Sequence, residues 1–184
     1  MIRIGVTGHR VLAEPGKIDA GVEAALRRIE QSFPGETFVI NSALAEGADR
    51  IVAHHVLGRL GSRLVVPLPL TESEYVKDFP SEASRAEFSS LLNRADEIEV
   101  MPPAATREQA YEAAGEFVLR NSDVLIAVWD GQLAQGTGGT GDIVSRARKQ
   151  KMPIAWVHAG NREPDSLRPT TLNDEQGSVT FENM

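Results

Sequence analysis

Residues 122–144 read SDVLIAVWDGQLAQGTGGTGDIV, and this stretch decides the fold. It begins with the most apolar run of the chain, continues through a glycine-rich turn and passes into a segment with helical spacing. A continuous apolar run is typical of a strand whose two faces are both covered. Strand, turn and helix in this order form the repeating unit of a parallel α/β sheet, so 122–130 is predicted to be a central strand.

The same alternation continues on both sides of this stretch. Apolar runs predict further strands at 2–7, 37–41, 63–68, 97–101 and 153–157. Helical spacing and capping residues predict helices between 15 and 34, over 46–60, from Ser81, from Thr106 to about Arg120, and after the glycine turn. The sequence therefore predicts an α/β fold with a doubly wound, mainly parallel sheet of about six strands and helices on both faces.

Length and composition limit the domain count and the kinds of site. The 184 residues suffice for one domain with a sizeable core. Residues 159–184 are polar and aperiodic, and they are expected to form a C-terminal tail, in which SVTFE at 178–182 could add an edge strand. The absence of cysteine excludes disulfides, thiolate metal sites and a cysteine nucleophile. The four histidines do not have metal-ligand spacing with carboxylates, so no metal site is expected.

The net charge of −7 disfavours nucleic acid as a partner. A protein that binds duplex DNA normally presents a basic face, because neutralising phosphates supplies most of its affinity. The basic cluster at 146–151 lies at a predicted helix end, where cations are favourable without any ligand. No apolar run is long enough to cross a bilayer and no signal peptide is recognisable, so we expect a cytoplasmic protein with no membrane partner.

The glycine turn itself predicts an anion site. Gly138, Gly139, Thr140 and Gly141 leave bare amides where a helix begins, and the helix dipole adds roughly half a positive charge there. Gly136, Gly138 and Gly141 also have the spacing of the dinucleotide-binding motif. In that motif, however, the glycine turn follows the first strand and an acidic residue at the end of the next strand holds the ribose. Here the turn follows the fifth strand and the sixth strand does not end in an acidic residue, so this match is discounted. The Lys-Ser/Thr ending of a Walker loop is missing, which disfavours an NTPase. A phosphate group is the favoured occupant, and a loop that merely tolerates glycine remains the alternative.

Further candidate site residues, both polar side chains and glycines, follow the other predicted strands at the same edge of the sheet. They are Gly8, His9 and Arg10 after the first strand, Ser42, Glu46, Gly47 and Asp49 after the second, and Asp130 and Gly131 after the fifth. Arg10 could hold a phosphate with two parallel hydrogen bonds. The carboxylates of Glu46, Asp130 and Asp142 could stabilise helix dipoles, bind sugar hydroxyls, or attack a glycosidic carbon.

Four aromatic side chains are candidates for stacking on a base. Tyr75 and Phe79 lie in the long loop at 69–80, which could act as a lid. Trp129 ends the central strand, and Tyr111 has helical spacing with apolar neighbours. We therefore expect Trp129 and Tyr111 to pack in the core.

Several of these motifs resemble those of the SLOG superfamily. They are IGVTGHR at 4–10, INSALAEGADRIVA at 40–53, VVPLP at 65–69, EYVKDF at 74–79, SDVLIAVWDG at 122–131 and GTGGTGDIV at 136–144. The superfamily includes the LOG phosphoribohydrolases, DNA-uptake processing proteins and nucleotide sensors of bacterial conflict systems. The resemblance implies a Rossmann-like domain over 1–158 that binds a nucleotide or a derivative such as ADP-ribose.

The resemblance also assigns places to the ligand. It implies a phosphate on residues 138–141, beside Gly8 of the first strand and the segment 42–49. LOG hydrolases have a proline before the paired glycines and a glutamate on the following helix. TGGTGDIV lacks that proline, and its nearby acid is Asp142, which is shorter and earlier. The departures disfavour hydrolysis and leave ligand binding intact.

Three hypotheses follow from these residues. The first is a nucleotide-binding sensor module that needs no further cofactor and signals through a separate effector protein or through self-assembly, including a homodimer formed by the third and fourth helices. The second is an enzyme that cleaves the N-glycosidic bond of nucleoside monophosphates, with Arg10 on the phosphate and Glu46, Asp130 or Asp142 at the sugar carbon. The third is a scaffold whose pocket no longer binds a ligand.

Overall fold

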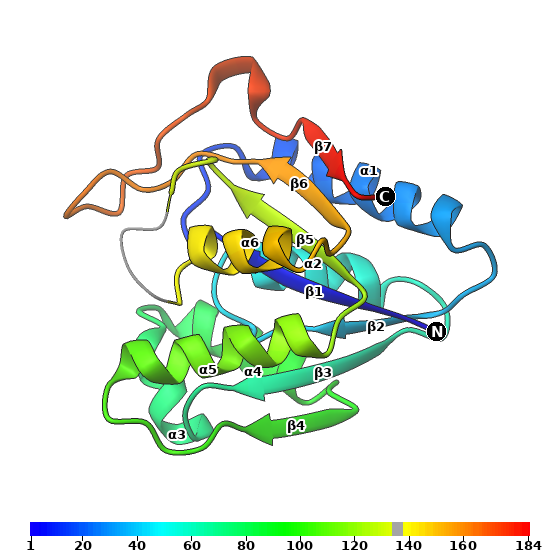
Figure 1. Cartoon of the computed structure of the whole chain (residues 1–184). Helices are drawn as coiled ribbons and strands as arrows, with labels where there is room; N and C mark the ends of the chain where they lie inside the picture. Colours follow the sequence, from blue (N-terminus) through cyan, green and yellow to red (C-terminus); the bar gives the residue numbers. More distant parts are fainter. Residues whose placement is uncertain (134–137) are drawn as a thin grey trace.

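The computed structural model describes residues 1–133 and 138–184. Residues 134–137, which include Gly136 and Thr137 of the predicted turn, lie outside the described part. The described strands form one sheet in the order β4-β3-β2-β1-β5-β6-β7 (Figure 1). The strands are β1 (Ile2–Gly8), β2 (Phe38–Asn41), β3 (Arg63–Leu68), β4 (Glu97–Val100), β5 (Val124–Trp129), β6 (Ile154–His158) and β7 (Val179–Glu182).

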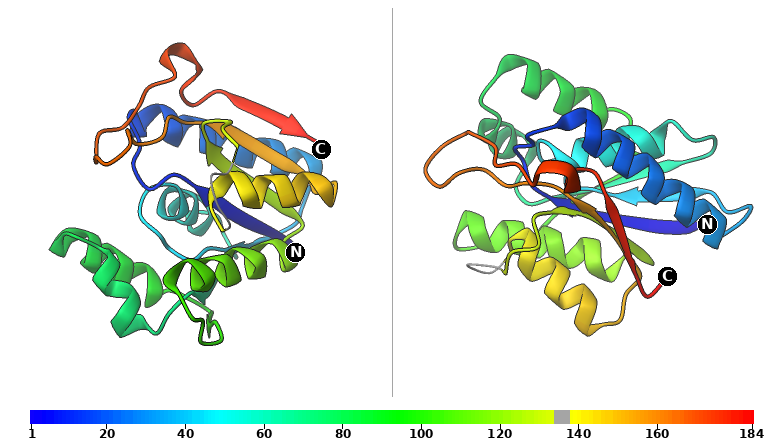
Figure 2. Two further views of the ribbon diagram at one scale, coloured as in Figure 1. Left: turned by 60° about the vertical axis from the view of Figure 1, so that its left-hand side comes forward. Right: turned by 90° about the horizontal axis from the view of Figure 1, so that it is seen from above.

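Helices cover both faces of this sheet (Figure 2). One face carries α1 (Pro15–Ser32), α2 (Ala48–Leu57) and α4 (Glu82–Leu92), and the other carries α5 (Arg107–Arg120) and α6 (Thr140–Lys149). The first six strands are parallel, whereas β7 is antiparallel to β6. The structure therefore confirms the predicted doubly wound α/β fold. The segment 178–182, which the sequence indicated could add an edge strand, contains β7 at the edge of the sheet beside β6.

The strand order reverses between β1 and β5. From β1 the chain adds strands outward to β4, and from β5 it adds strands in the opposite direction. Such a reversal opens a crevice at the carboxyl ends of the two central strands, and ligands of doubly wound proteins bind there. In this chain the crevice lies where Gly8 and Val128 are paired.

The central strands are the most buried elements. All six residues of β5 are buried, as their uninterrupted apolar character predicts. Trp129 is 3% exposed, which confirms its predicted place in the core. The two apolar layers hold the strand ends in fixed positions, so the loops that leave them are presented by a rigid scaffold.

The segment 69–80, predicted to be a loop that could act as a lid, is largely helical, and both of its aromatic rings are buried. This segment forms the short helices α3 (Glu72–Tyr75) and η1 (Val76–Asp78), and Tyr75 and Phe79 are each 1% exposed. Their ring centroids lie 5.1 Å apart, and Tyr75 lies 5.6 Å from the ring of Phe88. Phe79 follows Tyr75 by four positions, so one helical turn directs both rings to the same side. Tyr75 also lines the cavity at the β1–β5 reversal, whereas Phe79 does not.

Candidate functional site

A cavity of about 660 Å³ opens at the reversal of strand order. Three segments with predicted site residues contribute to its wall. They are the end of β1 with the loop that follows it (Gly8, His9, Arg10), the start of α2 (Glu46, Asp49) and the start of α6 (Gly138, Gly139, Thr140). These residues come from three of the segments that the sequence placed at one edge of the sheet. The structure thus brings together the first loop, the second loop and the glycine turn around one space.

Ser42 and Gly47 lie behind the wall and support it. The Ser42 hydroxyl accepts a hydrogen bond from the Leu44 amide at 3.1 Å and donates to the carbonyl of Asp49 at 3.4 Å. Gly47 has a φ of 75°, and a Cβ there would lie 2.5 Å from the carbonyl oxygens of His9 and Arg10. The loop after β2 therefore approaches the loop after β1 more closely than a side chain at residue 47 allows.

His9 ties the ends of β1 and β5 together. The amide of Asp130 donates to Nε2 of His9 at 3.2 Å, and Oδ1 of the same aspartate lies 3.4 Å from that nitrogen. Burial lowers the pKa of His9, although the neighbouring Asp130 carboxylate opposes this effect. An imidazole that accepts at Nε2 is neutral, with its proton on Nδ1. The amide of Asp130 is thus bound to His9, its carboxylate accepts from the Gln132 amide at 3.0 Å, and the residue is not part of the cavity wall.

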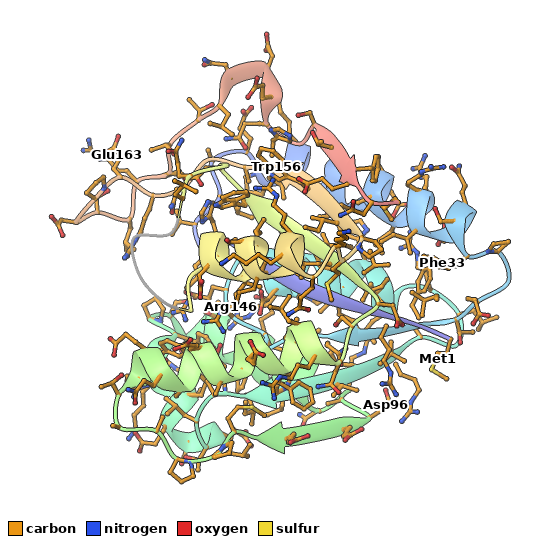
Figure 3. All side chains as sticks on the ribbon, viewed as in Figure 1. Met1, Phe33, Asp96, Arg146, Trp156 and Glu163 are labelled. Atoms are coloured by element: carbon orange, nitrogen blue, oxygen red, sulfur yellow. The ribbon has the colours of Figure 1, made fainter. Side chains whose placement is uncertain are left out.

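Asp142 and its neighbours form a charged network between α5 and α6. Its central cation is Arg146, which lies between the two helices in Figure 3. One carboxylate oxygen of Asp142 accepts from the Gly138 amide at 3.1 Å and lies 3.0 Å from the Arg146 guanidinium. Arg146 also pairs with Glu116 at 3.0 Å and with Glu112. Asp142, Gly141 and Gly131 are not part of the cavity wall. Gly131 has a φ of 81°, and a Cβ at this position would lie 3.1 Å from the Trp156 ring.

Two cations of the cavity wall lack a carboxylate partner. Arg10 and Arg162 are both exposed, and no carboxylate of residues 1–133 or 138–184 lies within ion-pair distance of either guanidinium. The guanidinium carbon of Arg10 lies 5.3 Å from the centroid of the Tyr111 ring, and the electrons of the ring face attract this cation. Both charges are available to an anion that enters from solvent.

The acidic part of the wall has a different character. Asp49 is buried, and burial raises the pKa of its carboxyl to about 6 against the opposing effects of the Ala45 amide and Arg10. Glu46 accepts a hydrogen bond from the Ser84 hydroxyl. Arg50 is 3% exposed and binds the Ser84 carbonyl at 2.9 Å, so it fixes the helix that holds Glu46 in place.

Sequence reasoning missed several residues of the wall. Tyr111 was expected in the core, but it is half-buried, lines the cavity and donates its hydroxyl proton to Asp78. Asn161, Arg162 and Leu167 come from the segment that was expected to be a tail. A turn signal was present there in Pro164 and Asp165, since both residue types favour reversals of the chain.

The described residues hold no group of three or more His, Cys, Asp or Glu side chains arranged for a metal ion. In the same part of the chain, no helix is both long enough and apolar enough to span a membrane. Neither observation bears on residues 134–137.

Comparisons with known proteins show a likeness in structure but not in sequence. No protein-family model matches the sequence, and no curated protein matches it. Among solved structures, the chain is similar to TM1055, a structural-genomics target determined by X-ray crystallography. The two share 14% sequence identity over 84% of this chain and 72% of the other, with a TM-score of 0.48.

Proposed function

We propose that the protein is a nucleotide-binding module of the SLOG type, which takes a nucleotide or a derivative such as ADP-ribose in the cavity at the β1–β5 reversal. A cavity of about 660 Å³ lies in the size range of small-molecule sites. Its position agrees with the general place of ligands in doubly wound sheets.

One observation carries this proposal. Arg10, from the loop after β1, lines the same cavity as Gly139 and Thr140, which begin α6. The guanidinium supplies a full positive charge with paired donors, and the helix start supplies amide donors and a partial positive charge. A phosphate group matches this combination, and the remaining space accommodates a sugar and a base.

Binding without hydrolysis is the favoured role. Asp130 and Asp142 are two of the three carboxylates that could attack a sugar carbon, but neither residue belongs to the cavity wall. The Asp130 carboxylate accepts from the Gln132 amide at 3.0 Å, and the Asp142 carboxylate pairs with Arg146. A sensor then passes its state to a separate effector protein or to a second copy of the chain. The ligand is the only small molecule that this role requires.

A binding screen tests the proposal. Thermal unfolding of the full chain is measured with the 5'-monophosphates and 5'-diphosphates of adenosine, guanosine, cytidine and uridine and with ADP-ribose, and hits are titrated by calorimetry. We expect at least one compound to raise the unfolding temperature, because a ligand that binds only the folded state stabilises it. No shift with any of these compounds would favour the vestigial scaffold.

Glu46 supports a second candidate, a hydrolase of the N-glycosidic bond. Its carboxylate lines the cavity near Asp49, whose pKa is raised to about 6. Glycosidic bonds are usually cleaved by two carboxyl groups that face one site. Incubation with nucleoside monophosphates and chromatography for free base decides between the roles. Release that Glu46→Gln abolishes would establish the enzyme.

A further inference from the structure

The segment after β6 forms a hairpin beside the cavity. Arg162 and Pro169 make an antiparallel bridge, and the Glu163 amide donates to the carbonyl of Arg168 at 2.7 Å. A Cβ on Gly160 would overlap the carbonyl of Thr170, so the two arms meet closely at their base. The hairpin comprises residues 160–170 and projects on the side where β5 and β6 end (Figure 1).

Two exposed side chains of this hairpin line the cavity. Leu167 lines the cavity although its side chain is 73% exposed, and Arg162 lines the same cavity as an exposed cation. The apolar surface of Leu167 is in contact with water, and an apolar group bound in the cavity would cover that surface. Arg162 keeps its charge unpaired among the described residues, whereas Arg148 and Arg146 are paired with carboxylates.

We propose that the 160–170 hairpin is the second half of the ligand site, in which Arg162 binds the ligand's anionic group and Leu167 covers its heterocyclic ring. This inference rests on the proposed function and names the chemistry of its ligand: one molecule with both a phosphate and an apolar ring. Arg10 and Arg162 approach the anion from the loops after β1 and β6, on either side of β5.

The hairpin would then become more ordered when ligand occupies the cavity, in addition to contributing to ligand affinity. Its connection to the sheet runs through Ala159, whose amide donates to the carbonyl of Trp129 at 3.0 Å. Ordering of Leu167 against a ring and of Arg162 against a phosphate would reduce the freedom of the hairpin. Its amides at 162–168 are expected to exchange more slowly with deuterium when ligand is bound.

Binding of matched probes tests the two roles separately. The probes are the nucleoside 5'-monophosphates of the four bases, the corresponding nucleosides, and ribose 5-phosphate, each titrated into the full chain. Arg162→Ala should weaken the best monophosphate and ribose 5-phosphate by about tenfold, the typical effect of losing a charge-assisted hydrogen bond, and should leave the nucleoside unchanged. Leu167→Ala should weaken the monophosphate and its nucleoside about threefold to tenfold and should spare ribose 5-phosphate.

Two variants serve as controls. Arg168→Ala removes an exposed arginine of the same hairpin that is not in the cavity wall, and Leu60→Ala removes a leucine that is fully exposed elsewhere. Both should bind every probe like the wild type. If the wild type binds a monophosphate but Arg162→Ala and Leu167→Ala behave like these controls, the hairpin proposal is wrong and the proposed function stands. If the wild type binds none of these probes and none of the diphosphates or ADP-ribose of the screen above, both proposals fail.

Discussion

The carboxylate of Asp142 accepts a hydrogen bond from the amide of Gly138 at 3.1 Å. The protein therefore places its own anion at the turn for which we propose a phosphate. Arg146 lies 3.0 Å from the same carboxylate oxygen and offsets part of its charge. A phosphate entering beside Gly139 and Thr140 would meet the remaining repulsion, so Asp142 limits the affinity of the site rather than contributing to it.

Asp142→Asn should bind nucleoside monophosphates more tightly, by about fivefold, because about 1 kcal/mol of like-charge repulsion is removed. Asparagine keeps an oxygen that can accept from Gly138. The free energy of unfolding should fall by up to ~1 kcal/mol, since Arg146 loses an ion pair and α6 loses an acid in its first turn. Calorimetric titration and urea unfolding measure the two effects.

Glu116→Gln is the matched control for this prediction. It removes another carboxylate from Arg146 but does not touch the glycine turn. Its binding should equal that of the wild type. Weaker binding by Asp142→Asn alone would show that the carboxylate contacts the ligand, which would favour the hydrolase.

Asp49 should make stability depend on pH. Burial raises its pKa from 3.8 to about 6, so the folded chain holds the proton more tightly than the unfolded chain does. The contribution of Asp49 is therefore fully present below about pH 4 and is lost as the pH rises through 6, at a cost of at most ~3 kcal/mol. Asp49→Asn has no such proton. The difference in free energy of unfolding, wild type minus variant, should decrease from pH 4 to pH 7 in urea titrations, and a constant difference would refute the assignment.

The close approach of Gly47 to the loop after β1 predicts a pair of glycine variants with opposite outcomes. Gly47→Ala should destabilise the fold by about 3 kcal/mol or more, because its φ is 75° and the new Cβ would clash with the carbonyls of His9 and Arg10. Gly16→Ala should stabilise by about 0.5–1 kcal/mol, because it lies in the first turn of α1 with nothing within 4 Å of the new Cβ. Thermal unfolding compares them, and equal effects of the two would contradict the role given to Gly47.

Much of the fold could be predicted because the pattern of apolar residues in the sequence matches the burial of the strands and helices in the structure. The apolar run of β5 indicates a strand covered on both faces, and the alternation of strands with helices indicates a parallel sheet. Ser81 and Thr106 cap α4 and α5 as their sequence contexts indicate, since each accepts a hydrogen bond from the amide three residues on. Gly8, Arg10 and Thr140 reach one cavity because parallel strands end at one edge.

Other parts depend on contacts that local sequence does not encode. Arg146, which pairs with Asp142, also pairs with Glu112 and Glu116 of α5, and these contacts follow from the packing of α5 against α6. Asp130 is held by His9 across the β1–β5 reversal, which requires the three-dimensional register of the two strands. The 160–170 hairpin reaches the cavity only because β7 returns along β6 and brings the connecting segment back over the sheet.

The central claim is that Arg10 holds a phosphate at the β1–β5 reversal, and calorimetric titration of the nucleoside monophosphates into wild type and Arg10→Ala tests it most directly. Arg28→Ala, which removes an exposed arginine of α1 outside the cavity wall, is the control. We expect the wild type and Arg28→Ala to bind the same monophosphate equally, and Arg10→Ala to bind it at least about tenfold more weakly. Arg10→Ala should remain folded, with a small loss of stability because the contact with the Tyr111 ring is lost. Equal binding by all three proteins would contradict the account.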